Sequence, residues 1–370
     1  MVLSNERDNM EKCVLAFKDL LAVSGMFTCS LKRFSRPEES IELTHMIEEE
    51  HLLDGYQLNR TASSWVKVVN NYKNKRKELK AMSNISLVFS FCACSGLLVR
   101  YPMVRLLESN PEDRLRGFPT PFVSYIPPEF DQISFVVYIF ILHFLIIILF
   151  AFEAFTAYTA LLQSLKKLLS DYENIYILLD DIKHSTGSSQ EKEFTSNEKQ
   201  IQRVDDVNNE EDLRKNMRLI VNYHQYINRS FEKCVRCSEY PIMVLSILII
   251  LDSCFNIFFM MQVKNPNVAI SHGSSFFFNN IFLLLCYNSG QQILNQNEIF
   301  RRHVAELPWI NKPKWFKQSM LIMMNRTNVD TEIKPYGIFV LNLTTYKDLL
   351  KAAFSFGNIL YTQKMIRKEH

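Results

Sequence analysis

The sequence predicts an all-α fold: a polytopic membrane bundle with about five spanning helices and long intracellular helical extensions. Charged residues are absent from residues 81–99, 132–152 and 265–297, and residues 240–263 contain only Asp252. Blocks of this length and composition are typical of membrane-spanning helices. Glycine is scarce, with nine residues, whereas phenylalanine is abundant, with 28. This balance favours lipid-facing helices over a β-rich fold, and an apolar helix near the C-terminus supplies the fifth span.

Six consecutive segments follow from this pattern. We expect a polar N-terminal segment, two membrane helices joined by a Pro-rich extracellular loop, intracellular helices with a disordered insert, two further membrane helices, an intracellular anchor segment, and a final membrane helix with a tail. Their bounds are 1–63, 64–160, 161–239, 240–293, 294–337 and 338–370.

The N-terminal segment shows no span of its own. Residues 13–27 are amphipathic, but the longest uncharged run, residues 20–31, is too short to cross a membrane. Residues 36–59 are acidic and polar. We therefore expect a cytosolic helix followed by irregular chain, and then a basic helix over residues 64–80 that leads into the membrane.

The first two spans are bounded by prolines and polar chain. The first covers residues 82–101, and the following residues 108–130 carry five of the chain's twelve prolines, which predicts a loop with fixed turns. The second span covers residues 133–158. From Leu161 the pattern becomes amphipathic and then gives way to the polar insert, which its composition predicts to be disordered.

The third and fourth spans cover residues 240–262 and 274–293. Asp252 is the lone acid in the middle of the third span. A carboxylate at this depth costs on the order of 2.5–3.5 kcal/mol on insertion scales. Asp252 should therefore face protein, water or a partner on another helix.

The final helix, expected from Ile338 to Tyr361, is long enough to cross about 30 Å of hydrocarbon. Lys347, Asp348 and Lys351 lie in its first half, and several hydroxyl and amide side chains follow. Lipid on all sides would penalise such groups, so a polar side must face water or protein. Two interpretations stay open: a spanning helix packed in a bundle, or a helix that lines a pore.

The loop charges predict the orientation. Three alternate connections, residues 64–83, 161–239 and 294–337, hold 25 lysines and arginines, against four in the other two. Because basic loops remain cytoplasmic, we expect the N-terminus inside and, after five crossings, the C-terminus outside. The basic tail after residue 363 mildly opposes this orientation.

Several classes of function lack support in the sequence. Of the eight cysteines, only Cys234 and Cys237 have ligand-like spacing, and no second pair completes a metal site. There is no Gly-rich phosphate loop, HExxH motif or nucleophile elbow, so a membrane-embedded enzyme is a remote alternative. Basic residues do not cluster with aromatics as in nucleic-acid recognition. We therefore expect no cofactor, no metal and no nucleic-acid partner.

The C-terminal third carries a set of residues at distinctive spacing. They are Cys286-Tyr287, Gly290, Gln292, Trp309 nineteen residues after the glycine, and the stretch FVLNLTTYKDLLKAAFSFGNIL. This pattern resembles the C-terminal signature of insect odorant receptors. Val340 stands where the family pattern has proline. The gustatory receptors end in T-Y-x5-Q-F; Thr345-Tyr346 is present, but Ala352-Ala353 replaces Gln-Phe, so a gustatory-type channel is the second interpretation.

The resemblance implies the fold and function in more detail. The family has seven spanning helices, and the five visible here correspond to its third through seventh. It implies an odorant-gated, non-selective cation channel in the plasma membrane, in which this chain is a tuning subunit of a hetero-tetramer with the odorant receptor co-receptor. Because two spans are missing, a truncated, non-conducting receptor form is an alternative. Carried over by position, the apolar gate falls on Ile359 and the polar position one turn later on Thr362, with Gln363 adjacent.

For the odorant, a small volatile ligand, we expect a pocket in the outer halves of the first, second and fourth visible spans. Aromatic walls with few polar groups suit a ligand held by dispersion and one hydrogen bond. The candidate ligand-binding residues, grouped by span, are Cys94, Leu97 and Tyr101; Phe135, Tyr138 and Leu142; and Phe276, Phe277 and Asn280.

Overall fold

The computed structural model describes residues 10–55, 62–106, 133–192, 201–263, 266–310, 312–329 and 331–369. Most of these residues are helical and none of them lies in a strand, which confirms the all-α prediction. The elements are α2 (Met10–Ser35), α3 (Pro37–Glu48), α4 (His51–Gly55), α5 (Ala62–Leu106), α6 (Ile133–Lys192), α7 (Ile201–Gln262), α8 (Pro266–Ala305), α9 (Lys314–Arg326), the 3-10 turn η2 (Pro335–Gly337) and α10 (Leu343–Glu369).

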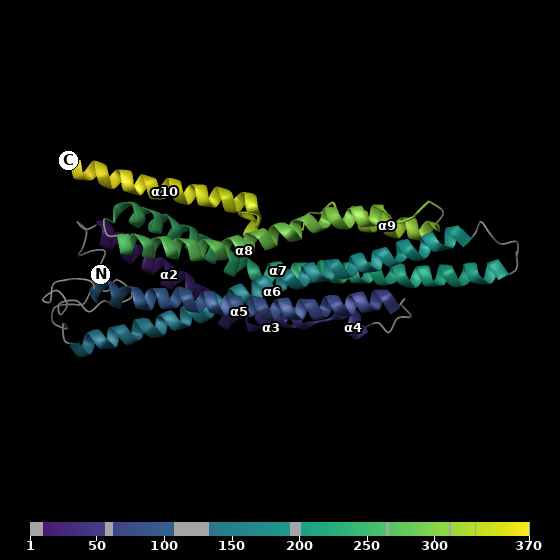
Figure 1. Ribbon diagram of the computed structural model, residues 1–370, viewed down its shortest axis with the longest axis horizontal. Coiled ribbons are helices and arrows are strands. Elements are labelled where there is room, and N and C mark those ends of the chain that lie inside the picture. Colours follow the sequence, from purple (N-terminus) through teal and green to yellow (C-terminus); the bar gives the residue numbers. More distant parts are fainter. Residues whose placement is uncertain are drawn as a thin grey trace.

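Four long helices give the molecule its elongated shape (Figure 1). α6 and α7 contain 60 and 62 residues, and α5 and α8 contain 45 and 40. At 1.5 Å per residue a 60-residue helix is about 90 Å long, three times the hydrocarbon thickness of about 30 Å. Each of the two longest helices therefore has a large part outside the membrane. α2 and α10 lie beside one half of the bundle, and α4 and α9 lie beside the other half (Figure 1).

The half that holds α2 and α10 is the apolar half. Among the described residues, Glu210–Gln262 contains a stretch long and apolar enough to cross a membrane, and Tyr138–Leu149 is a shorter apolar stretch. Ile141, Leu145 and Leu149 are exposed along one side of α6 at a spacing of four residues. Residues at that spacing share a helix face. An exposed aliphatic stripe of this kind is what a lipid-facing helix presents.

The opposite half is held by an aromatic core. Tyr72, Tyr172 and Tyr223 are fully buried there together with Phe300 and Phe316. A second core, which includes residues of α6, α7 and α8, lies nearer the apolar half and buries Tyr287. The long helices are therefore joined over most of their length, and the extensions beyond the apolar half form a packed body.

The N-terminal segment differs from the sequence prediction. α2 lies alongside α7, with Gly25 directly against Leu248, whereas we expected a cytosolic helix. The interval expected to be irregular contains α3, which starts with Pro37 at its first turn and carries Glu38 and Glu39 there. A proline and acids at these positions favour helix initiation. Charged residues interrupt α2, so hydropathy alone does not reveal a helix at the level of the spans.

The path of α2 also changes the expected placement of the termini. Lys18 lies beside Asp252 and Lys32 lies over the Tyr240 ring, so α2 runs antiparallel to α7. Leu360, near the end of α10, packs against the last turns of α7. The first half of α2 lies beside the same part of α7. The two helix ends therefore lie at the same end of the bundle (Figure 1), not at opposite ends as predicted.

Two further boundaries differ. The polar insert predicted to be disordered is helical up to Lys192 and again from Ile201, and residues 193–200 lie outside the described residues. The final helix begins at Leu343 rather than Ile338. The Asn342 side chain accepts a hydrogen bond from the backbone N–H of Thr345 at 2.8 Å, which is N-cap geometry, so the helix cannot begin earlier without losing its cap.

Candidate functional site

α10 uses one face for packing against the bundle. Ala353 is buried, and a Cβ atom at Gly357 would lie 2.8 Å from the Ile257 side chain and 3.2 Å from the Cys254 carbonyl oxygen. Leu360 continues this face one turn later and packs against phenylalanines of α7. Small residues at positions 353 and 357 thus allow close contact between the backbones of α10 and α7.

The opposite face of α10 is polar and open in the single chain. Lys351, Ser355 and Thr362 are exposed there at helical spacing, and the Thr362 hydroxyl donates to the Asn358 carbonyl at 3.0 Å. Ile359, at the edge of this face, is 50% exposed. The three residues assigned to the gate, Ile359, Thr362 and Gln363, are therefore all uncovered by the chain itself.

Exposed aromatic residues flank the polar face. Phe354 and Phe356 project on either side of it, and Phe354 also contacts Phe276 of α8 with ring centroids 5.8 Å apart. A polar strip with aromatic edges differs from a lipid-facing surface, which would be apolar throughout.

The predicted ligand residues do not all come together. Cys94, Leu97 and Tyr101 lie on α5, but their side chains are outside the described residues. On α6, Phe135 is half-buried, whereas Tyr138 is 65% exposed and Leu142 is also exposed.

The three ligand residues predicted on α8 point to different sides. Phe276 and Asn280 face α7 and α10, and Asn280 donates to the Ser253 hydroxyl at 2.8 Å. Asn280 lines a crevice between α7, α8 and α10 that has no room for a water molecule. Phe277 is 59% exposed and contacts Phe278 instead. Phe276 and Asn280 therefore serve helix packing, whereas Phe277 lies on another side of α8.

A polar cluster around Asp252 was only partly foreseen. The Lys18 ammonium group lies 2.6 Å from one carboxylate oxygen of Asp252. The other oxygen accepts hydrogen bonds from the Asn256 and Asn279 amides at 2.7 and 2.9 Å. The ring of His272 extends the cluster, 3.1 Å from the Asn256 side-chain oxygen. Asp252 thus has the partner on another helix that its depth requires, and this partner comes from α2.

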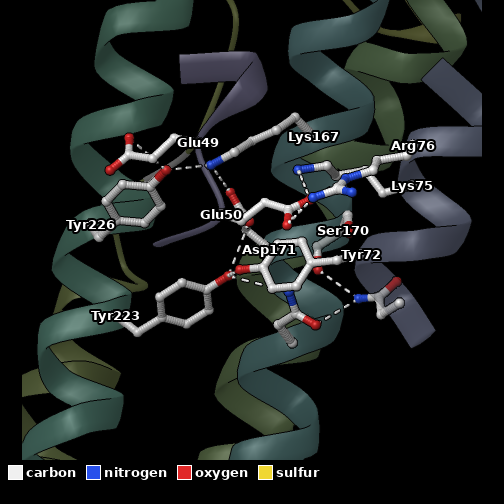
Figure 2. Close-up of polar contacts among 12 residues, drawn as sticks. Glu49, Glu50, Tyr72, Lys75, Arg76, Lys167, Ser170, Asp171, Tyr223 and Tyr226 are labelled. Atoms are coloured by element: carbon white, nitrogen blue, oxygen red, sulfur yellow. Dashed lines mark hydrogen bonds and ion pairs between the residues drawn. The ribbon is translucent and has the colours of Figure 1, made fainter. Parts of the chain in front are cut away.

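A second polar cluster joins α5, α6 and α7 with the segment between α3 and α4, and Figure 2 shows its contacts. Lys167 and Asp171 form a fully buried ion pair one turn apart on α6, with side-chain exposures of 0% and 1%. The Tyr223 hydroxyl donates to Asp171 at 3.0 Å, and Lys167 donates to the Tyr226 hydroxyl at 2.5 Å. The Tyr226 hydroxyl in turn donates to Glu49 at 3.1 Å. The chain of contacts therefore joins α6, α7 and the segment between α3 and α4.

The same cluster attaches α5. Arg76 donates two hydrogen bonds to the Glu50 carboxylate, at 2.9 and 2.7 Å. Lys75 lies 4.9 Å above the Tyr72 ring and 3.9 Å from Glu50 (Figure 2). Burial lowers the pKa of the Lys75 ammonium group. Burial also raises the pKa of the Tyr223 and Tyr226 hydroxyls, and Asp171 raises both further. These phenols stay neutral and can act as donors.

His224 is part of the same packed body. It is buried and stacks on Phe300, with ring centroids 4.4 Å apart. Burial, aided by Arg326, lowers the pKa of His224 to about 4, so the ring is neutral at physiological pH. Its contacts assign it to helix packing.

Long helices with an apolar half and a packed polar half define a multi-pass membrane protein with large helical extensions. A family model described as 7tm Odorant receptor matches residues 12–354. The chain belongs to the insect odorant receptor family. The match covers Cys286, Tyr287 and Gly290 and ends before Ile359.

Solved structures show the same fold. The insect olfactory receptor OR5 from Machilis hrabei in complex with eugenol is similar over 96% of this chain and 82% of that chain, with a TM-score of 0.72 and 9% sequence identity. A second structure of the insect olfactory receptor OR5 from Machilis hrabei is similar over 97% of this chain and 83% of that chain, with a TM-score of 0.69 and 10% sequence identity. No curated protein sequence matches the chain.

Membership of this family confirms the resemblance found in the C-terminal third. The family comprises receptors and ion channels rather than enzymes, in agreement with the lack of catalytic motifs. The family model also supports the odorant interpretation over the gustatory one.

Proposed function

We propose that this chain is a subunit of an odorant-gated, non-selective cation channel whose pore is lined by α10. The observation that carries this proposal is the division of α10 into a packing face, with Ala353 and Gly357, and an open polar face, with Ser355 and Thr362. A ring of such faces from several subunits would surround water. Ile359 would dewet the narrow part when closed, and Thr362 and Gln363 would hydrate a passing cation.

The assembly we propose is a hetero-tetramer with the odorant receptor co-receptor. Exposed apolar side chains at the end of the bundle opposite the start of α2 support subunit contacts in the anchor segment. They are Trp309, Ile310, Leu321 and Ile322. Apolar groups that a single chain leaves in water are typical of protein–protein contact.

The ligand we propose is a small volatile compound that binds in the outer half of the apolar region. Tyr138 and Phe277 leave large aromatic surface uncovered, which each would present to the ligand. Tyr138 lies on the same exposed side of α6 as Ile141 and Leu145, so the pocket would open toward lipid on that side. Cys94, Leu97 and Tyr101 on α5, and Phe135 and Leu142 on α6, remain candidates for the same pocket. Phe276 and Asn280 would act on the ligand only through the packing of α7, α8 and α10.

We propose a plasma-membrane location with both helix ends, the start of α2 and the end of α10, on the extracellular side. The extensions that contain Tyr72, Tyr172 and Tyr223 would then lie in the cytoplasm. The excess of lysine and arginine in those connections supports this orientation.

The gate assignment is tested by substituting Ile359. With the co-receptor, Ile359→Ala should widen the apolar constriction and raise the basal current several-fold, and Ile359→Gln should in addition hydrate it and change cation selectivity. Whole-cell currents with sodium, potassium and calcium measure both effects. Leu343→Ala is the matched control, since Leu343 is an exposed apolar residue at the opposite end of α10. Basal current and selectivity unchanged in both Ile359 variants would contradict the gate, and no current in any variant would favour the non-conducting receptor form.

A further inference from the structure

A cavity of about 80 Å³ lies where the end of α2 and the start of α3 meet α6, α7 and α8. Its inner walls are mostly apolar and include Leu43, Leu245 and Leu283. α2 ends and α3 begins near the middle of the bundle, where its apolar half adjoins the polar extensions (Figure 1). The cavity is therefore placed at the boundary between the two halves, away from the predicted odorant residues.

The mouth of this cavity is charged. Lys32, Arg33 and Arg36 line it together with Glu39 and Glu153. Lys32 and Arg36 share the single carboxylate of Glu39, at 3.2 and 3.1 Å, whereas Arg33 pairs with Glu153 at 3.2 Å. Arg36 leaves much of its side chain in solvent, at 63%. Among the lining residues, three cations thus face two carboxylates. Because Lys32 and Arg36 share the Glu39 carboxylate, one of them can bind another anion instead.

The interior also offers a polar contact. The Ser238 hydroxyl lines the cavity and is buried, and its side-chain partner is the thiol of Cys234, one turn earlier on α7. A thiol is a weak hydrogen-bond partner, so the hydroxyl can also contact a polar group in the cavity. An apolar cavity with a buried hydroxyl and a basic mouth is arranged for a molecule with two unlike ends.

We propose that this cavity binds an anionic amphiphile. Its headgroup would bind Lys32 and Arg36 at the mouth, and the few carbons of its apolar chain that a cavity of about 80 Å³ can hold would enter between Leu43 and Leu245. Arginine and lysine form charge-assisted hydrogen bonds with both carboxylate and phosphate. A fatty acid and an anionic phospholipid share this chemistry. The proposal depends neither on odorant binding nor on ion conduction, so its failure would leave both untouched.

Native mass spectrometry of the purified chain in detergent tests the site. The protein is incubated separately with oleate, with dioleoyl phosphatidic acid, and with dioleoyl phosphatidylcholine, which has no net charge. We expect at least one of the two anionic lipids to be retained about tenfold more than phosphatidylcholine. Retention of oleate alone would identify a fatty-acid site, retention of phosphatidic acid alone a phospholipid site, and retention of both a general site for anionic amphiphiles.

Two variants locate the binding. The double substitution Lys32→Gln and Arg36→Gln removes the headgroup contacts. Ala157 of α6 also lines the cavity, and Ala157→Phe fills the cavity without changing its charge. Each should lower retention of the anionic lipid about tenfold. Lys183→Gln, which alters an exposed ion pair with Glu306 elsewhere on the bundle, is the control and should leave retention unchanged. Equal retention of all three lipids, or retention that neither cavity variant lowers while both elute as monodisperse protein, would overturn the proposal.

Discussion

Replacing Gly290 with alanine is expected to abolish the folded receptor. A Cβ atom at this position would lie 2.2 Å from the carbonyl oxygen of Leu341. The contact is with backbone, so no side-chain rotation can relieve it, and the segment that leads into α10 would have to move. We expect a loss of more than about 3 kcal/mol, which is a large share of the 5–15 kcal/mol that typically separates folded from unfolded protein.

Gly273→Ala, on the same helix, is the matched control. A Cβ atom there would meet only the end of the Met260 side chain, at 3.5 Å, which is an ordinary contact. Fluorescence-detected size-exclusion chromatography of tagged receptor measures the monodisperse fraction of each variant. The Gly290 variant should lose most of its monodisperse peak, and the Gly273 variant should match the unsubstituted chain. Equal peaks for the two variants would show that the segment before α10 is not held as described.

Breaking the ion pair between Lys18 and Asp252 is expected to have the second large effect. Each charge lies at the level of the membrane helices and is mostly buried, so removing one partner leaves the other without an opposite charge. Losses of about 3–5 kcal/mol are usual for such changes, and the partial exposure of both groups favours the lower end. Asp252→Asn and Lys18→Met should therefore each lower the thermal midpoint of the detergent-purified receptor.

The double variant separates an ion pair from general damage. If the two charges stabilise each other, Lys18→Met combined with Asp252→Asn should recover much of the loss caused by either single change. Lys183→Met provides the comparison, because its ion pair with Glu306 is about half exposed and should contribute less than about 1 kcal/mol. Additive losses in the double variant would mean that α2 is held by other contacts.

The sequence predicts the parts of the fold that depend on long uncharged runs. The spans within α5, α6 and α8 are continuous blocks without charge, and the span within α7 contains only Asp252, so composition alone locates them. α2 is different, because Lys18 and Arg33 have partners on α7 and α6 that no local pattern can reveal. The sequence places the start of the final helix five residues too early for a related reason. Apolar residues 338–341 match the helical period, but the hydrogen bond from Thr345 to the Asn342 side chain decides where α10 begins.

The candidate site was predictable to a similar degree. The polar residues of α10 already indicated a helix with one polar side that faces water or protein, and the structure shows which face packs. The residues on α8 could not be separated by spacing alone. Phe276 and Phe277 are neighbours of the same type, and only the position of α10 decides that the first is covered while the second is exposed. The ion pair of Lys167 and Asp171 has ordinary helical spacing, and its complete burial follows from tertiary packing.

Cysteine accessibility along α10 tests the central claim most directly. With the co-receptor and during odorant application, a positively charged thiol reagent should block the current of Ser355→Cys and Thr362→Cys, whose side chains lie on the open polar face. It should not affect Ala353→Cys or Leu360→Cys on the packing face, nor the unsubstituted chain. Block at Leu360→Cys with no block at Thr362→Cys would contradict a pore lined by α10.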